Sequence, residues 1–369
     1  MSATDNPKWL SDLTVEHVNA LTPYESARRL FAGSGADAEQ VWLNANESPF
    51  AGEYAVDSSV FNRYPDCQPD TVIKAYAKYA NLQASQTIVT RGADEGIELI
   101  VRAFCEAGKD SILICPPTYG MYAISAQTFN VGVHRSLLNN DFSLNIPDIL
   151  SYVGKVKAVF ICSPNNPTGT SVSQQDIVEV LEAFKDQAIV VVDEAYIEFD
   201  IAQTQTDLLG KYENLVILRT LSKAFALAGL RCGFTLASSD IIQTLLKVIA
   251  PYPIPAPVAQ IASKALENHG LAKMRNDVEV LKSELISLRT ALADIGDIQI
   301  IGDTNANFVL FRTQSKTELM ACLVKHKMLI RDQSKQINLQ NCLRITIGNP
   351  AQNKTLLALI KAFFADGNQ

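Results

Sequence analysis

The chain has 369 residues, 47% of them hydrophobic and 19% charged, which suffices for the cores of two or three domains and excludes a disordered or disulfide-stapled chain. With 32 basic and 39 acidic residues the net charge is −7 and no basic stripe is present, so nucleic acid and membrane surfaces are poor candidates for partners. No apolar run is long enough to span a bilayer, and the first residues lack a signal or transit pattern. We therefore expect a cytoplasmic protein.

Seven cysteines stand singly along the chain, without a CxxC pair or a Cys/His cluster at zinc-ligand spacing. Their odd number and their scatter favour reduced thiols in a reducing compartment. We expect no metal site.

From about residue 86, short β-rich runs alternate with segments of helix length. A run at 87–90 precedes an amphipathic stretch that ends at Gly108, and further runs lie at 111–115, 157–162, 188–193, 215–220 and 232–237. Their hydrophobicity is continuous rather than alternating, which indicates strands buried on both faces. The pattern predicts an α/β fold, with one large domain over 45–265 whose mostly parallel sheet is covered by helices on both faces.

The segment PYPIPAPVAQ (251–260) predicts a stiff extended connector, because its four prolines disfavour both regular helix and central strand. It marks the exit from the large domain. Beyond it come a long helical pattern at 256–294, a β-rich stretch at 298–313, a short helix near 316–327 and a strand at 343–348. We expect a smaller α+β domain over 266–369, with residues 1–44 forming an N-terminal arm and part of that domain.

In open α/β sheets ligands collect at the carboxyl ends of the strands, and polar residues follow several of the expected strands here. After 87–90, Gly92 allows a tight turn and the amides of Ala93 and Asp94 open a helix, which suits an anion. Taken alone, an ordinary helix cap is the favoured interpretation. Tyr119, after the next strand, can cover a flat ligand, although alone it is better explained as a core or loop tyrosine.

The loop SPNNPTG (163–169) reads most simply as a turn in which Asn165 or Asn166 aims an amide inward. The apolar strand at 188–193 ends at Asp193, and Glu194 and Tyr196 follow. A carboxylate closing so apolar a strand is costly unless it meets a cation or a protonated nitrogen. This position therefore favours a binding site over a solvated face.

A lysine stands after the strand at 215–220, where Lys223 follows Thr220 and Ser222, and Arg231 precedes the next strand. An isolated lysine is usually a surface residue. Together with the other strand ends it completes what pyridoxal phosphate needs: a lysine that holds the aldehyde as a Schiff base, a carboxylate for the pyridine nitrogen, and donors for the phosphate.

Five motifs in this order resemble the fold type I pyridoxal-phosphate aminotransferases: RGADEG (91–96), CPPTYGMY (115–122), SPNNPTG, VVDEAYIEF (191–199) and TLSKAFALAGLRCG (220–233). Five others resemble, more narrowly, the histidinol-phosphate aminotransferases of histidine biosynthesis: NANESPF (44–50), RYPDCQP (63–69), PYPIPAPVAQ, NANF (305–308) and LRITIG (343–348). The resemblance runs from near residue 23 to residue 348, and the combination of motifs is highly specific.

The resemblance implies three catalytic residues. Lys223 would carry the cofactor as a Schiff base, Asp193 would pair with the pyridine nitrogen, and Tyr196 would bond the ring hydroxyl together with Asn166. Tyr119 would stack on the ring. The cofactor phosphate would lie among the amides of Ala93 and Asp94, the side chains of Thr220, Ser222 and Arg231, and Tyr64 of the partner subunit in a homodimer.

The implied reaction transfers the amino group of L-histidinol phosphate to 2-oxoglutarate, giving imidazole-acetol phosphate and L-glutamate. One anion site must accept both a substrate phosphate and a glutamate carboxylate, and Arg344 of LRITIG resembles the family arginine that does so. Tyr24, Asn46 and Arg331 are further candidates for contact with the substrate, although Arg331 fits an exposed loop arginine equally well.

Three other functions remain open at this stage. The nearest is another fold type I enzyme, such as an aromatic aminotransferase or a phosphothreonine decarboxylase. A non-enzymatic regulator with a transaminase-like domain would need a basic output module, for which the chain has neither room nor charge. A lyase or aldolase that uses Lys223 without pyridoxal phosphate would leave Asp193 and Tyr119 without a purpose.

Overall fold

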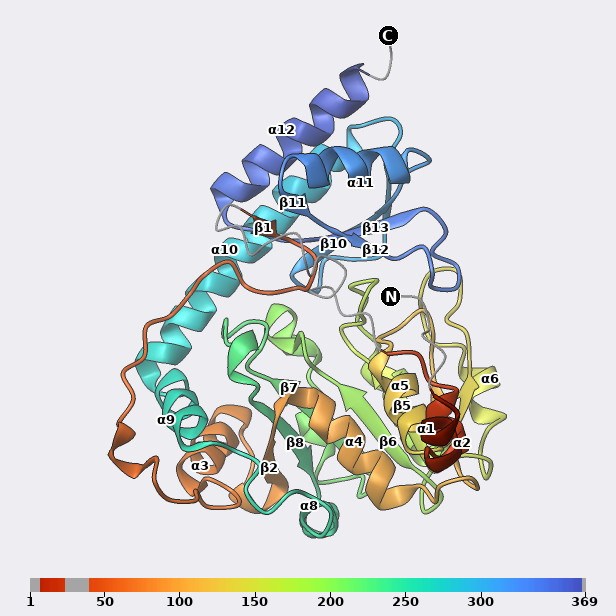
Figure 1. Cartoon of the computed structure of the whole chain (residues 1–369), viewed down its shortest axis with the longest axis vertical. Coiled ribbons are helices and arrows are strands. Elements are labelled where there is room, and N and C mark those ends of the chain that lie inside the picture. The colour runs from red at the N-terminus through yellow and green to blue at the C-terminus, as the bar shows by residue number, and fades with distance from the viewer. Residues whose placement is uncertain (1–6, 24–39, 367–369) are drawn as a thin grey trace.

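The structure, a computed structural model, describes residues 7–23 and 40–366 (Figure 1). Its largest element is a seven-stranded sheet. In spatial order the strands are β2 (Thr87–Thr90), β8 (Gly233–Ala237), β7 (Leu215–Thr220), β6 (Ile189–Asp193), β5 (Ala158–Cys162), β3 (Ser111–Ile114) and β4 (Gly132–Arg135). Only β8 runs against its neighbours, so the sheet is mostly parallel, as the sequence predicts.

Helices cover both faces of this sheet. One face carries α4 (Gly92–Phe104), α5 (Met121–Thr128) and α8 (Ser239–Leu246), and the other α3 (Asp70–Ala80), α6 (Ile146–Leu150) and α7 (Gln174–Ala183). Strand β7 shows why its hydrophobicity is continuous: Val216 and Leu218 pack on the face that carries α4, α5 and α8, while Leu215 and Ile217 pack on the opposite face. The fold is therefore the predicted α/β architecture.

A second, antiparallel sheet lies above the first in Figure 1. Its strands, in order, are β12 (Arg331–Asp332), β13 (Cys342–Thr346), β10 (Phe308–Arg312) and β9 (Gln299–Ile301), and α11 (Lys316–Lys325) and α12 (Pro350–Asp366) lie together beside them. A two-stranded parallel ladder joins β1 (Val41–Trp42) to β11 (Met328–Leu329), so an early segment lies with the second sheet. The domain limits at residues 44 and 265 stay a prediction.

The helical pattern at 256–294 proves to be two helices, α9 (Ala256–Ala265) and α10 (Asn268–Ala293), rather than one. The break lies at Glu267, whose backbone is extended, and a Cβ at Gly270 would come within 2.3 Å of the carbonyl oxygen of Ala265. Glycine at 270 therefore allows the end of α9 to come this close to the start of α10. The expectation of an extended segment over 251–260 is also wrong for its second half, because Pro255 caps α9 and Pro257 is tolerated in the first turn.

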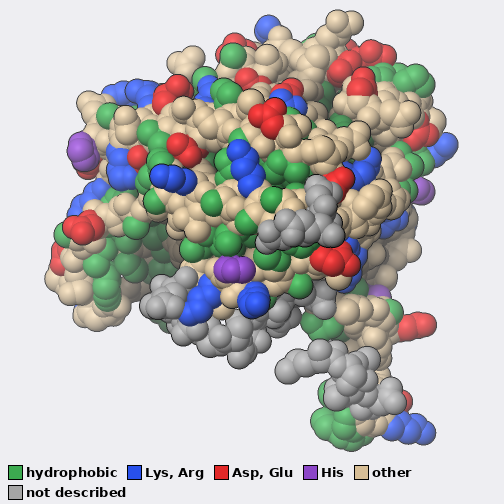
Figure 2. Space-filling view, turned by 90° about the horizontal axis from the view of Figure 1, so that it is seen from above, with side chains coloured by type: hydrophobic (Ala, Val, Ile, Leu, Met, Phe, Trp, Pro, Cys, Tyr) green, Lys and Arg blue, Asp and Glu red, His purple; other side chains and the backbone are tan. Residues whose placement is uncertain are grey.

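Several smaller elements complete the described ranges. Near the N-terminus, α1 (Lys8–Leu13) is followed by α2 (Glu16–Asn19), which lies against α5, with Nε2 of His17 3.3 Å from the carbonyl oxygen of Thr128. Short 3₁₀ turns lie at Ser58–Val60, Ala84–Gln86, Ile197–Phe199, Ile201–Gln203, Thr206–Leu208 and Ala228–Leu230. Across the described ranges no helix is both long and apolar enough to cross a membrane. On the face shown in Figure 2, acidic and basic side chains are interspersed.

Two loops join the sheets at close range. The amide of Asp303 donates to the carbonyl oxygen of Thr168 over 2.8 Å, and the amide of Asn305 donates to that of Gly169 over 3.1 Å. Gly302 has a φ of +70°, and a Cβ there would lie 1.9 Å from the carbonyl oxygen of Thr168. Only glycine allows the backbones to meet in this way. The contact holds the second sheet over the carboxyl ends of the first.

We expect Gly302→Ala to destabilise the protein by both backbone strain and a clash with Thr168, together roughly 2 to 4 kcal/mol. Gly154→Ala is the matched control, because Gly154 has a φ of +76° but its nearest neighbour is the flexible end of Gln187 at 3.6 Å. Thermal unfolding should show a clearly larger loss for the change at 302. Equal losses would mean that the contact between the loops contributes nothing.

Candidate active site

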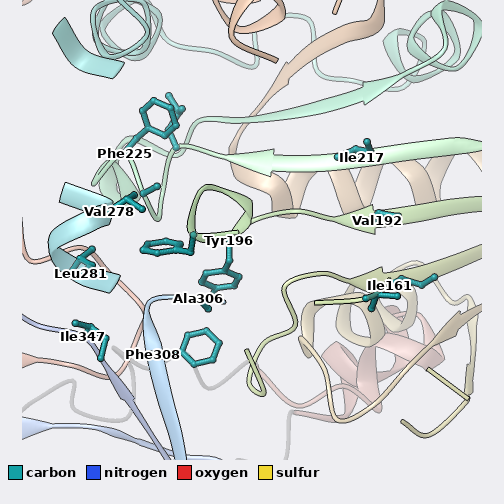
Figure 3. Close-up of a cluster of buried hydrophobic side chains, with 14 of the residues drawn as sticks. Ile161, Val192, Tyr196, Ile217, Phe225, Val278, Leu281, Ala306, Phe308 and Ile347 are labelled. Carbon is teal, nitrogen blue, oxygen red and sulfur yellow. The ribbon is translucent and has the colours of Figure 1, made fainter. Parts of the chain in front are cut away.

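A cavity of about 700 Å³ lies between the carboxyl ends of β5, β6 and β7 and the second sheet. Figure 3 shows the junction, where Tyr196, from the loop after β6, faces Phe308 of β10, and their rings meet edge to face with centres 5.4 Å apart. The cavity brings together thirteen of the residues predicted from the sequence: Asn46, Ala93, Asp94, Tyr119, Asn166, Asp193, Tyr196, Thr220, Ser222, Lys223, Arg231, Arg331 and Arg344. Their individual roles remain predictions.

One predicted residue, Tyr64, is not among the described residues that line the cavity. Tyr64 is 81% exposed and stacks on Tyr252, with ring centres 4.4 Å apart. Tyr24 lies outside the described residues.

The floor of the cavity carries a buried carboxylate, that of Asp193 at the end of β6. Its Oδ2 accepts a hydrogen bond from the hydroxyl of Tyr122 over 2.7 Å, and its Oδ1 accepts one from the amide of Ala195 over 3.1 Å. Burial nevertheless raises the pKa of Asp193 to about 6, because the ionised form has lost its water. A protonated nitrogen brought against this carboxylate would stabilise its ionised form.

Tyr122 is a functional candidate that the sequence analysis missed. It is fully buried on α5, with its ring stacked on Phe160 at 5.1 Å, and its hydroxyl points at Asp193. It stands three residues after Tyr119 in the same motif. The presence of a second tyrosine soon after a strand end could have suggested a functional role for Tyr122. The sequence could not show its partner, because the carboxylate that it contacts lies 71 positions away.

Lys223 follows β7 and its amine lies in the cavity. Nζ donates to the carbonyl oxygen of Ala45 over 3.1 Å and lies 5.6 Å from the centre of the Tyr196 ring. Burial and the nearby Arg344 guanidinium lower the pKa of Lys223 to about 8. At pH 7 about a tenth of this amine is therefore unprotonated, far more than for an ordinary lysine, and this form can act as a nucleophile or a proton acceptor.

One end of the cavity is built to hold an anion. Arg231 donates to Oγ of Ser222 over 3.3 Å and to the carboxylate of Asp94 over 3.1 Å, and Thr220 donates to the same Ser222 oxygen over 2.9 Å. These groups surround the N-terminus of α4. A Cβ at Gly92 would lie 2.6 Å from Nη2 of Arg231, so glycine lets the guanidinium close over the free amides of the helix.

Two arginines stand at the other end, on neighbouring strands. Arg331 of β12 and Arg344 of β13 are direct partners in the antiparallel register, and both line the cavity. Arg344 is buried and donates to Oδ1 of Asn166 over 2.6 Å and to the carbonyl oxygen of Asn44 over 3.0 Å. Two like charges side by side favour an anion between them.

Tyr196 is buried, and burial raises the pKa of its hydroxyl above the usual value, so that it keeps its proton. The hydroxyl accepts a hydrogen bond from Nδ2 of Asn46 over 2.8 Å. Asn46 is also buried, and both polar atoms of its side chain bond protein groups, with Oδ1 accepting from Thr346 over 3.2 Å.

Comparison with known proteins agrees with this geometry. The family description "aminotransferase class I and II" matches residues 30–360. A histidinol-phosphate aminotransferase of Pseudoalteromonas atlantica is 62% identical over 95% of this chain and 94% of its own. Among solved structures, the histidinol-phosphate aminotransferase of Clostridium acetobutylicum has a TM-score of 0.79 at 25% identity, covering 88% of this chain and 99% of its own. That of Sinorhizobium meliloti, solved with pyridoxal-5'-phosphate, has a TM-score of 0.82 at 20% identity and covers 95% and 98%.

The fold, with its lysine and carboxylate at neighbouring strand ends, is that of the class I and II aminotransferases. Within that class, the 62% identity to the Pseudoalteromonas protein extends over nearly the whole of both chains and indicates the narrower family. The chain belongs to the histidinol-phosphate aminotransferase family.

We expect Tyr122→Phe to raise the pKa of Asp193 further above its ordinary range, because the hydroxyl bonds the ionised carboxylate. A hydrogen bond to a charged group is worth about 1.5 to 3 kcal/mol, so affinity for pyridoxal phosphate near pH 7 should fall roughly 10- to 100-fold. The pH below which binding weakens should rise as well. Spectroscopic titration at several pH values measures both, with Tyr152→Phe as control, since Tyr152 does not line the cavity. Unchanged affinity and pH dependence would mean that Tyr122 only fills space.

Proposed function

We propose that the chain is a pyridoxal-phosphate enzyme that transfers the amino group of L-histidinol phosphate to 2-oxoglutarate, giving imidazole-acetol phosphate and L-glutamate. This reaction belongs to histidine biosynthesis, and we place it in the cytoplasm, where the seven free cysteines would stay reduced. The observation that carries the proposal is that Lys223, whose pKa is lowered, and the buried Asp193 line one cavity that has cationic groups at both ends.

The residues present fit the cofactor. Asp193 is a buried carboxylate whose pKa is raised by its surroundings, and a pyridine nitrogen that carries a proton would reverse that effect. The amides at the start of α4, with Ser222 and Arg231, suit its phosphate. Lys223 lies in the same cavity and would bind its aldehyde. When bound, the cofactor supplies an electron sink for the bonds of the substrate α-carbon.

The chain itself contributes proton transfer and electrostatics. The amine of Lys223, with a pKa of about 8, can accept a proton and return it near neutral pH. Asp193, once ionised, would hold a positive charge at the floor of the cavity in both the ground state and the transition state. Tyr196 keeps its proton and can donate a hydrogen bond inside the cavity.

The substrate end fits two different anions. Arg331 and Arg344 lie opposite each other on β12 and β13, and planar guanidinium groups can bond either a phosphate or a carboxylate. That property suits an enzyme which must hold histidinol phosphate in one half-reaction and glutamate in the other. The alternative substrates are an aromatic amino acid or phosphothreonine. The assay described next distinguishes both of them from histidinol phosphate.

The test follows the absorbance of the protein loaded with pyridoxal phosphate as single amino donors are added. We expect histidinol phosphate and glutamate to convert it, and phenylalanine, tyrosine and phosphothreonine to do so far more slowly. Conversion by phenylalanine but not by histidinol phosphate would contradict the substrate, and release of CO₂ from phosphothreonine would indicate a decarboxylase. A protein that gains no absorbance band with pyridoxal phosphate would overturn the cofactor.

Lys223→Ala should lower turnover by roughly 10²- to 10⁴-fold, while substitution of the exposed Lys185 by Ala should not.

We also propose that two copies of the chain form the working enzyme, with Tyr64 of the partner subunit reaching the cofactor phosphate. The support is a set of exposed apolar side chains, Val56, Val60, Phe61, Tyr64 and Tyr252, of which Tyr64 and Tyr252 stack on each other. Aromatic side chains gathered in this way are typical of the buried part of an interface. The Tyr64 ring is already ordered by its stack on Tyr252, which lowers the entropy lost on association.

Mixed dimers test this sharing. Tyr64→Ala and Lys223→Ala should each be nearly inactive, but a dimer with one subunit of each kind would contain one complete site. Mixed dimers purified through two different affinity tags should therefore show about half of the normal activity, since each has one of its two sites intact. Co-expression of two differently tagged Lys223→Ala chains is the control. A monomeric protein, or mixed dimers without activity, would contradict the proposal.

A further inference from the structure

We propose that Asn46 is a positioning residue, which fixes Tyr196 as a hydrogen-bond donor toward the cavity and holds the acceptor for the Lys223 amine. The inference rests on the proposed function, because it concerns how this chain presents two of its side chains to the cofactor. It assigns Asn46 a role through other residues, rather than the substrate contact that the sequence suggests.

The second sheet fixes the orientation of the Asn46 side chain. Its backbone amide donates to Oγ1 of Thr346 over 2.9 Å, so the hydroxyl proton of Thr346 is available for Oδ1 of Asn46, 3.2 Å away. Asn307 donates to the carbonyl oxygen of Asn46 over 3.1 Å. Thr346, Asn307 and Asn46 are all buried. With Oδ1 bonded to Thr346, the NH₂ group is the end that meets Tyr196.

This orientation decides the direction of the hydrogen bond to Tyr196. Nδ2 of Asn46 has no lone pair to offer, so across the 2.8 Å contact the tyrosine oxygen accepts. Because burial raises the pKa of Tyr196, the hydroxyl keeps its own proton. That proton is then left to point away from Asn46, into the cavity that Tyr196 lines. Accepting a bond also makes the hydroxyl a stronger donor.

Backbone carbonyl groups next to Asn46 accept hydrogen bonds from two neighbouring cations. Asn46 has a φ of +55°, the left-handed region that asparagine tolerates better than most residues. In this conformation the carbonyl oxygen of Ala45 accepts from Nζ of Lys223 over 3.1 Å, and that of Asn44 accepts from Arg344 over 3.0 Å. Three consecutive residues thus contact an arginine, a lysine and a tyrosine of the site. Asn46 connects the second sheet to all of them.

The functional consequence concerns proton affinity in the loaded enzyme. Tyr196, as a donor, would bond the ring hydroxyl oxygen of the cofactor in its deprotonated state and so favour that state. The other titratable groups that influence Tyr196 are Arg344, Lys223, Asp193 and Cys162. Both Asn46 substitutions leave all four in place, but Asn46→Asp adds a carboxylate, so Asn46→Gly is the variant that changes no charge. Loss of Asn46 should therefore raise the pH at which the visible absorbance of the cofactor-bound protein changes.

The experiment compares two substitutions at position 46. Asn46→Gly keeps the left-handed backbone and removes the side-chain bonds. Asn46→Asp keeps the shape, but its carboxylate can only accept, so it turns the Tyr196 proton away from the cavity. We expect the absorbance midpoint to rise by about 0.5 to 1 pH unit for Gly and by more for Asp. The value of kcat should fall roughly tenfold, with KM for glutamate changed less than about threefold.

Two further variants test the orientation itself. Thr346→Val removes the hydroxyl that fixes the Asn46 amide and should shift the midpoint in the same direction, whereas Thr346→Ser should restore it. Asn81→Gly is the control for a change at a left-handed asparagine, since Asn81 has a φ of 56° at the exposed end of α3. Thermal unfolding of the cofactor-free proteins checks that every variant folds.

The possible outcomes separate this inference from the proposed function. If the wild-type protein shows no pH-dependent band with pyridoxal phosphate, both are overturned. If the wild type titrates and both variants at position 46 keep its midpoint within about 0.2 unit, the role of Asn46 is overturned alone. The role of Asn46 is also overturned if Asn46→Gly shifts the midpoint no more than Asn81→Gly does. It is overturned as well if Thr346→Ser shifts the midpoint as much as Thr346→Val.

Discussion

The site depends on one unfavourable element, the carboxylate of Asp193 at the end of a strand of buried aliphatic residues. Its pKa of about 6 reports the cost of removing that charge from water, even with hydrogen bonds from Tyr122 and the amide of Ala195. The large sheet stabilises this arrangement, because β5 and β7 flank β6 and helices cover both faces. A folded chain can keep such a group only where the rest of the core is ample, and a bound cation then relieves the cost.

Glu194, the residue after Asp193, is a buried carboxylate that is neutralised within the protein. Oε2 of Glu194 lies 2.7 Å from Nη2 of Arg219 and 2.9 Å from its Nε, and both side chains are almost fully buried. Because neighbouring residues project to opposite sides, Asp193 and Thr220 line the cavity while Glu194 and Arg219 pair behind it. The same two strand ends therefore build a closed ion pair on one side and an open site on the other.

The sequence predicted the parts of the fold that depend on local pattern. Continuous hydrophobicity located β2 and β7, whereas β4 was missed because its four residues are exposed or only half buried. Motifs directly after strands gave the residues that now line one cavity. What could not be predicted depends on distant contacts: Tyr122 meets a carboxylate 71 positions away, and Asn46 is fixed by Thr346, 300 positions away.

The cavity also holds positive charges whose free-energy cost a bound ligand can remove. Although the chain carries a net charge of −7, Arg331 and Arg344 face each other in register at one end, and Arg231 lies over a helix N-terminus at the other. The two neighbouring arginines repel each other, and an anion between them removes that cost, while Arg231 and the helix N-terminus suit a second anion. The arrangement is thus complementary to a ligand pair with a positive charge near its centre and negative charges at its ends. Binding is favoured by these local groups, since the field of the whole chain would repel such anions.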